Sequence, residues 1–315
     1  MDGEPVFALV TQASTQSRAL DRVTKRGPAL DGIVRRVGTG RGVTIYVFDG
    51  GIADNHEELA GRLRIGFDAF PTSPRICNAH GTAVAGAAAG ATLGVAPAAE
   101  IVDVKIINCE RMRGSVRAIV AAAQWTAADH AKHPGQAAIA NWSFVVDTVG
   151  DVPAIDSAVV ILHDAGMLVV ASAGNFDVDA CRVSPGNAPG TFVVGASALV
   201  RTAGGVLWRD VRVPNTAWGP CVDLYAPGDE VLLPSVEHGH PTSTSWSGTS
   251  MAAGFASGAA ALLLERMPST VPEQLAELLK RRATRNVLDE QIVVASAVPA
   301  SVRTTLLYAG PTSRP

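Results

Sequence analysis

The sequence predicts an α/β protein with a doubly wound, mainly parallel central sheet and helices on both faces. Apolar, β-branched runs alternate along the chain with helical stretches of small residues, the pattern of strands joined by crossover helices. The strand-like runs are apolar throughout rather than alternately polar. Continuous apolarity indicates strands that are buried on both faces, as in parallel sheets covered by helices.

Six strands and five helices follow from these patterns. The predicted strands are Val43–Asp49, Ile101–Ile107, Ala137–Ser143, Met167–Ala173, Thr191–Ser197 and Cys221–Ala226. The predicted helices are His80–Gly90, Ser115–Lys132, Ile155–Ala165, Ser250–Glu265 and Pro272–Lys280. The segment Arg201–Pro214 is predicted to be a surface hairpin. No repeat, long linker or break in composition divides the chain.

Length, charge and apolar content exclude several classes of partner. The chain has 315 residues, a formal net charge of −3 and 47% hydrophobic residues, which suits one large or two ordinary domains. It has no basic stripe, so we expect no nucleic-acid partner. No apolar run approaches the roughly 20 residues that a membrane-spanning helix needs, so we expect no membrane partner. The first nine residues do not read as a signal peptide.

The most informative motif is Ser247-Gly248-Thr249-Ser250, which precedes the run of small residues Ala252–Leu264. That run predicts a buried helix with Ser250 at its start. Free backbone N–H groups at a helix start stabilise a developing negative charge, which is what a serine nucleophile requires. Serine is also a common helix N-cap. The motif alone leaves both interpretations open.

Three further motifs favour the nucleophile. Asp49 ends the first predicted strand, His80 opens a helix, and Asn175 follows the strand that ends in Ser172-Ala173-Gly174. A nucleophilic serine needs an imidazole base and a carboxylate that orients it, and the Asn175 amide can join the Ser250 N–H in an oxyanion hole. Asp49, Ser143 and Asn175 lie at carboxyl ends of strands, where doubly wound folds bind ligands. The order Asp, His, Ser is that of subtilisin.

From about Leu20 to Ala309, these motifs resemble the subtilase family, in particular its proteinase K and aqualysin branch. The resemblance implies a subtilisin-like serine endopeptidase with Asp49, His80 and Ser250 as the triad and Asn175 with Ser250 as the oxyanion hole. It implies substrate-binding segments at Ser143, Phe144 and Val145 and at Ser172, Ala173 and Gly174. Residues 20–310 would form the catalytic domain, residues 1–19 an N-terminal extension and residues 311–315 a frayed tail.

The four cysteines have no CxxC or metal-ligand spacing, which by itself leaves disulfides and buried thiols open. The resemblance implies the pairs Cys77–Cys109 and Cys181–Cys221, and hence an oxidising compartment. We therefore expect a secreted, extracellular protein, a monomer that acts on proteins or peptides. The family's pro-segment and signal peptide are not recognisable in the chain; such a pro-segment would be a partner that acts as an inhibitor.

Several residues depart from the family pattern. Gly50 replaces a hydroxyl residue, Ala83 a histidine and Gly254 a proline; inside a helix, Gly254 is expected to cost about 1 kcal/mol relative to Ala. Val145-Val146 stands where the family has Gly-Gly, which predicts narrowed or unusual specificity. We expect no catalytic cofactor or metal. The resemblance leaves a structural calcium ion open. The calcium site of proteinase K itself does not carry over, because Ala198 replaces its aspartate.

These departures keep two alternatives to hydrolysis open. One is a catalytically weak or silent subtilase that is used for binding. The other is acyl transfer to an amine, that is, peptide ligation or cyclisation, because only the acceptor of the acyl group differs from hydrolysis.

Overall fold

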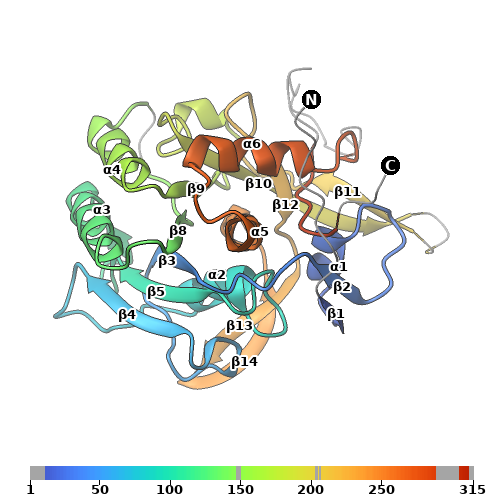
Figure 1. Cartoon of the computed structure of the whole chain (residues 1–315), viewed down its shortest axis with the longest axis horizontal. Coiled ribbons are helices and arrows are strands. Elements are labelled where there is room, and N and C mark those ends of the chain that lie inside the picture. Colours follow the sequence, from blue (N-terminus) through green and yellow to red (C-terminus); the bar gives the residue numbers. More distant parts are fainter. Residues whose placement is uncertain (1–10, 147–149, 203–204, 206, 289–304, 312–315) are drawn as a thin grey trace.

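The computed structural model describes residues 11–146, 150–202, 205, 207–288 and 305–311, and its centre is an eight-stranded sheet. The strand order is β11-β10-β9-β8-β3-β5-β4, and β12 also pairs with β10 (Figure 1). Every pairing in this sheet is parallel except that of β10 with β11. The predicted fold class, a mainly parallel α/β sheet, is therefore confirmed.

Six strands of the sheet lie where the sequence predicts them, and all except β3 have shifted ends. They are β3 (Val43–Asp49), β5 (Glu100–Lys105), β8 (Ala137–Trp142), β9 (Leu168–Ser172), β10 (Thr191–Arg201) and β12 (Leu224–Pro227). The strand β12 begins three residues later than predicted because a turn precedes it, in which Val222 N–H donates to the Gly219 carbonyl at 3.1 Å.

Two strands of the sheet were not predicted as such, β4 (Leu63–Asp68) and β11 (Trp208–Arg212). None of the β4 residues is fully buried, so its sequence lacks the continuous apolar run that marks the inner strands. The strand β11 forms the return of the hairpin expected at Arg201–Pro214. Its last three residues are buried, so the expectation of a surface hairpin is wrong for this part.

Helices cover both faces of the sheet (Figure 1). The helices α3 (Val116–His130) and α4 (Pro153–Asp164) contribute to the core on one face. The helices α2 (His80–Ala89), α5 (Thr249–Arg266) and α6 (Pro272–Arg282) contribute to the core on the other face. Each lies within two residues of its predicted bounds, because helix periodicity and caps are local signals.

The helix α5 runs through the centre of the protein, and all its residues from Thr249 to Leu264 are buried. At Gly254 it crosses α2 so closely that a Cβ atom would lie 2.8 Å from the Val84 carbonyl oxygen. The expected cost of glycine holds only with other things equal, and at this position a methyl group would meet the backbone of α2. Close helix packing, which the sequence does not show, outweighs the helix propensity of alanine.

Short elements complete the described part of the fold. The hairpin β13 (Val231–Glu237) and β14 (His240–Trp246) packs on α2, with Pro234 against Gly86. A second hairpin pairs β6 (Ile107–Asn108) with β7 (Arg113–Gly114). Two short 3-10 helices lie in loops of the sheet: η1 (Glu57–Leu59) between β3 and β4, and η2 (Ala180–Arg182) between β9 and β10. Neither hairpin was predicted.

The N-terminal segment is joined to the main body. The strand β1 (Thr11–Ser14) pairs with β2 (Ile33–Arg36), and α1 (Arg18–Thr24) lies between them. Arg22 of α1 forms a buried ion pair with Asp210 of β11 at 2.8 Å. Of the predicted extension 1–19, residues 1–10 lie outside the described residues, as do residues 312–315 of the predicted tail.

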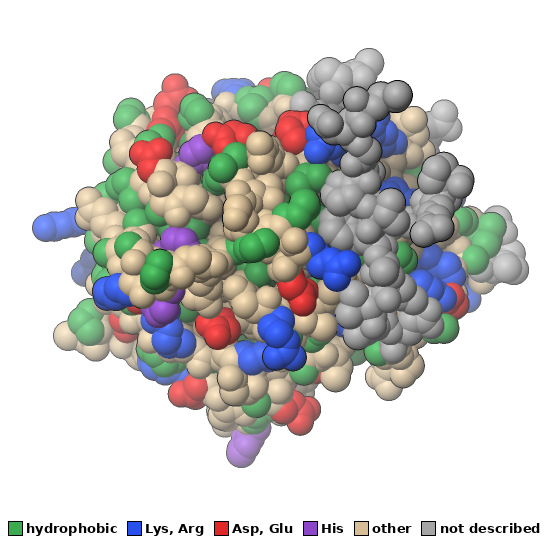
Figure 2. All heavy atoms as spheres, in the orientation of Figure 1, with side chains coloured by type: hydrophobic (Ala, Val, Ile, Leu, Met, Phe, Trp, Pro, Cys, Tyr) green, Lys and Arg blue, Asp and Glu red, His purple; other side chains and the backbone are tan. Residues whose placement is uncertain are grey.

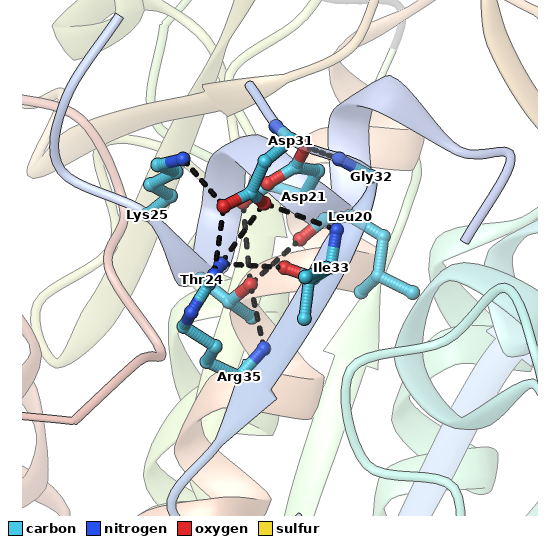
Figure 3. Close-up of polar contacts among 8 residues, drawn as sticks. All are labelled: Leu20, Asp21, Thr24, Lys25, Asp31, Gly32, Ile33 and Arg35. Carbon is cyan, nitrogen blue, oxygen red and sulfur yellow. Dashed lines mark hydrogen bonds and ion pairs between the residues drawn. The ribbon is translucent and has the colours of Figure 1, made fainter. Parts of the chain in front are cut away.

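Asp31 is the centre of a polar network that closes the turn between α1 and β2 (Figure 3). Its carboxylate accepts from Lys25 at 2.8 Å and from Arg35 at 2.7 Å. Hydrogen bonds from these two cations hold the pKa of Asp31 below its usual value. Asp21 accepts from the backbone N–H groups of Asp31 and Gly32, so the network fixes the turn from both sides.

In the part of the chain that the structure describes, no helix is long and apolar enough to cross a membrane. On the face shown in Figure 2, lysine and arginine side chains are interspersed with aspartate and glutamate. Among the described residues of this face, the basic side chains do not form one continuous surface.

Candidate active site

The site lies where the winding of the sheet reverses. From β3 the chain continues to β4 and β5 on one side, whereas β8 and β9 lie on the other side. Such a switch point leaves a crevice at the carboxyl ends of the strands. Asp49 is the last residue of β3, and Ser143 directly follows the neighbouring strand β8. The topology therefore brings residues almost 100 positions apart to one edge.

Asp49 and His80 are in direct contact. His80 Nδ1 lies 2.8 Å from Asp49 Oδ2 and 3.0 Å from Oδ1. Asp49 Oδ1 also accepts from the Gly50 N–H at 2.7 Å. The helix α2 begins at His80 and can approach β3 because Gly81 has no side chain. A Cβ atom at Gly81 would lie only 2.5 Å from the Gly51 carbonyl oxygen. Only glycine allows this approach without displacement of the Asp49 loop.

The environment of His80 sets its basicity. The Asp49 side chain is 6% exposed and the His80 side chain 30% exposed. Burial lowers the pKa of His80, but the negative charge of Asp49 and its hydrogen bond outweigh that effect, so the pKa lies above its ordinary value of 6.5. The Trp246 ring meets the imidazole edge-on, with 6.2 Å between ring centroids. The contact of Trp246 with His80 could not be predicted from the sequence, because it depends on how the β13–β14 hairpin packs.

Ser250 lies in the first turn of α5 and faces Ser143. Its hydroxyl donates to the Ser143 carbonyl at 3.1 Å, and the Ser143 hydroxyl donates to the Ser250 carbonyl at 3.0 Å. Among the described residues, no hydrogen bond joins Ser250 to His80. The hydroxyl of Ser250 is thus held by a backbone acceptor of the predicted substrate-binding segment.

Asn175 is fixed beside the start of α5. Its Oδ1 accepts from the Thr249 N–H at 3.0 Å and from the Thr249 hydroxyl at 3.1 Å. These two donors identify the oxygen of the amide, so its Nδ2 group is left to donate elsewhere. The side chain is exposed, and Gly248 lies against its nitrogen. This arrangement suits an amide that donates to a ligand.

The two predicted substrate-binding segments leave adjacent strands. Ser143, Phe144 and Val145 follow β8, whereas Ser172, Ala173 and Gly174 end β9 and continue beyond it. Val145 Cγ1 lies 3.4 Å from the position of a Cβ atom at Gly174. The valine side chain thus reaches across the gap between the segments.

Two pockets flank the first of these segments. One, of about 470 Å³, is lined by Phe144, Val145, Val146 and residues of the β6–β7 hairpin that include Met112. The other, of about 180 Å³, lies between this segment and the pair Asp49–His80. The β6–β7 hairpin that lines the larger pocket could not be predicted from the sequence, because strands of two residues have no recognisable pattern.

Both disulfides form the pairs that the resemblance implies, Cys77–Cys109 and Cys181–Cys221. The first lies beside the loop that follows Asp49, because a Cβ atom at Gly50 would lie 3.2 Å from Cys77 Cβ. The Cys77 N–H also donates to the Gly50 carbonyl at 2.8 Å. The bridge therefore occupies the space in which a side chain at position 50 would lie.

Ala198 does not suit a calcium site. It is buried in β10 opposite Val211, and its methyl group offers no ligand oxygen. Within the described ranges, no group of three or more His, Cys, Asp or Glu side chains could hold a metal ion.

Comparisons with known proteins agree with the sequence motifs. Residues 40–297 match the subtilase family. The chain is similar to an extracellular serine proteinase of Thermus sp. (strain Rt41A), with 37% identity over 85% of this chain and 62% of the relative. It is also similar to alkaline serine exoprotease A of Vibrio alginolyticus, with 33% identity over 89% of this chain and 49% of the relative. The chain thus spans about half to two thirds of the length of these relatives.

A solved structure shows the same fold over almost its whole length. The crystal structure of a cold adapted subtilisin-like serine proteinase matches with a TM-score of 0.76 and 33% identity, covering 92% of this chain and 97% of that chain. With the family match over residues 40–297, these similarities show that the chain belongs to the subtilase family.

Proposed function

We propose that this protein is a secreted serine endopeptidase of narrowed specificity, in which Ser250 attacks the peptide carbonyl and His80 accepts its proton. The hydrogen bond between His80 and Asp49 carries the proposal. It fixes the tautomer that leaves Nε2 free as a base, and the raised pKa of His80 suits proton transfer near neutral pH.

A peptide substrate would activate the nucleophile by pairing with the segment at Ser143. A substrate added as a β-strand donates backbone N–H groups to this segment. A backbone N–H of the substrate would donate to the Ser143 carbonyl and replace the hydrogen bond that the Ser250 hydroxyl donates to it in this structure. The freed hydroxyl can then rotate toward His80. The resulting oxyanion would accept from the Ser250 N–H and from Asn175 Nδ2.

Val145 supports the narrowed specificity. Its Cγ1 atom lies 3.4 Å from the position of a Cβ atom at Gly174, so its side chain would narrow the space for a substrate side chain between the two segments. We infer a preference for small side chains at this position of the substrate. Replacing Val145 by Gly is expected to broaden the set of peptides cleaved in a library digest; an unchanged set would contradict the inference.

Secretion and a monomeric state are part of the same proposal. Two disulfides indicate an oxidising compartment, and one relative is named an extracellular proteinase. The substrates would be proteins or peptides.

Labelling with a fluorophosphonate tests the proposed chemistry. The natively disulfide-bonded protein should react, and Ser250→Ala should not. Ser247→Ala is the matched control, because Ser247 belongs to the same motif but is exposed, and its hydroxyl donates a hydrogen bond to Asp229. The Ser247→Ala variant should still react. An inert folded protein would refute the nucleophile, and peptide products that are joined rather than cleaved would show acyl transfer instead of hydrolysis.

A further inference from the structure

Asp103 is a buried carboxylate one strand away from Asp49. It lies on β5, opposite Val47 of β3, and its residue is 2% exposed. Its Oδ2 atom accepts from the Ile52 N–H at 3.1 Å, whereas Oδ1 has no hydrogen-bond partner. An acidic residue amid an apolar strand is costly to bury. A role in the neighbouring site would explain its presence.

Arg75 joins Asp103 in holding the same residue. Its NH1 group donates to the Ile52 carbonyl at 2.9 Å and lies 3.4 Å from Asp103 Oδ2. Asp103 and Arg75 thus bind both backbone polar groups of Ile52, the third residue after Asp49. The backbone of Arg75 also packs against Gly51, the residue before Ile52. A Cβ atom at Gly51 would lie 2.1 Å from the Arg75 carbonyl oxygen.

The held loop contacts both members of the Asp49–His80 pair. Gly50 donates its N–H to Asp49 Oδ1, and the Gly51 carbonyl lies against Gly81 at the start of α2. A shift of Ile52 would therefore move the donor of Asp49 and the helix start that carries His80.

We propose that Asp103 is a positioning residue, which with Arg75 fixes the turn Gly50–Ile52 and thereby the geometry of the Asp49–His80 pair. This inference rests on the proposed function. The charged groups around Asp103 are Arg75, Asp49 and Asp68; Asp68 is paired with Lys105, and Arg75 also contacts Asp54. Burial raises the pKa of Asp103 to about 7, so its charge changes in the range in which the enzyme would work.

The test compares Asp103→Ala, which removes the acceptor, with Asp103→Asn, which keeps an oxygen for Ile52. Asp103→Ala should lower kcat by roughly tenfold to 100-fold with KM changed less than about twofold, because misplaced catalytic groups affect the chemical step. Asp103→Asn should restore most of kcat and remove the ionisation of Asp103 from the pH profile, leaving that of His80. Val102→Ala is the control for stability: it removes a buried side chain of the same strand and should leave kcat unchanged below its unfolding temperature.

Unchanged kcat in folded Asp103→Ala would overturn the proposal, as would equal losses in the Ala and Asn variants. If Asp103→Ala does not fold, Arg75→Ala decides, because the Arg75 side chain is 33% exposed. It should lower kcat several-fold, and normal kcat would overturn the proposal. Fluorophosphonate labelling separates the two hypotheses: an unreactive wild type refutes the proposed function, whereas equal labelling rates of wild type and Asp103→Ala refute only the role of Asp103.

Discussion

Replacing Asp103 by Asn is expected to change how stability depends on pH. In the folded protein the carboxyl group holds its proton up to about pH 7, because burial raises its pKa from 3.8. The unfolded chain releases the same proton near pH 3.8. Between these values the folded state binds more protons, so the free energy of unfolding falls as pH rises. Asparagine cannot ionise, so this contribution disappears in the variant.

The magnitude follows from the shift of about three pKa units at 1.36 kcal/mol each, or ~4 kcal/mol at full ionisation. Urea unfolding from pH 4 to pH 8 measures it, in a Ser250→Ala background that prevents self-digestion. The unfolding free energy of Asp103→Asn minus that of its parent should rise by ~4 kcal/mol across this range. A pH-independent cost of the amide cancels in that comparison.

A matched control is Asp54→Asn. Asp54 contacts the same arginine, but its side chain is 64% exposed, so the variant removes a carboxylate beside Arg75 without changing the buried one. A difference for Asp103→Asn that is constant within about 1 kcal/mol from pH 4 to pH 8 would refute the reasoning.

Three further changes test the site and the packing. Asp49→Asn should lower kcat by roughly 10⁴-fold in a peptide assay, because His80 loses the partner that fixes its tautomer, and the pH at which activity reaches half its maximum should fall; a loss below tenfold would contradict this role. Arg22→Met should cost about 3–5 kcal/mol in urea unfolding, because Asp210 is left as a buried unpaired charge; a loss under about 1 kcal/mol would show that water reaches the pair. Gly254→Ala should destabilise by about 1–3 kcal/mol because no methyl group fits beside α2, whereas helix propensity alone predicts stabilisation.

The inner strands and long helices could be predicted because their signals are local. The strand β3 agrees with its predicted bounds because the six residues before Asp49 are apolar or β-branched. The helix α5 is apolar on every side, the mark of a central helix. By contrast, β4 and the hairpin β13–β14 carry mixed patterns, and what they pack against decides their conformation.

The candidate site could be predicted as a set of residues but not as a geometry. Asp49, His80 and Asn175 occur in short motifs; Asp49 and Asn175 lie at or beyond the carboxyl ends of strands of one sheet, and α2 brings His80 to Asp49. The hydrogen bond from Ser250 to Ser143 joins residues 107 positions apart, and no local pattern shows it. Asp103 did carry a signal, since it is an acidic residue within an apolar run, but only its contact with Ile52 connects it to the site.

The departures from the family pattern are best understood together with what surrounds them. At position 50 there is no side-chain hydroxyl, and the backbone N–H of Gly50 donates to Asp49 at 2.7 Å. The space of the missing side chain is filled by the Cys77–Cys109 bridge. The turn is also held through Ile52 by Asp103 and Arg75. Backbone groups, a disulfide and the side chains of Asp103 and Arg75 thus hold the loop around the Asp49 carboxylate, so these contacts, rather than a hydroxyl, are the ones whose removal should slow the reaction.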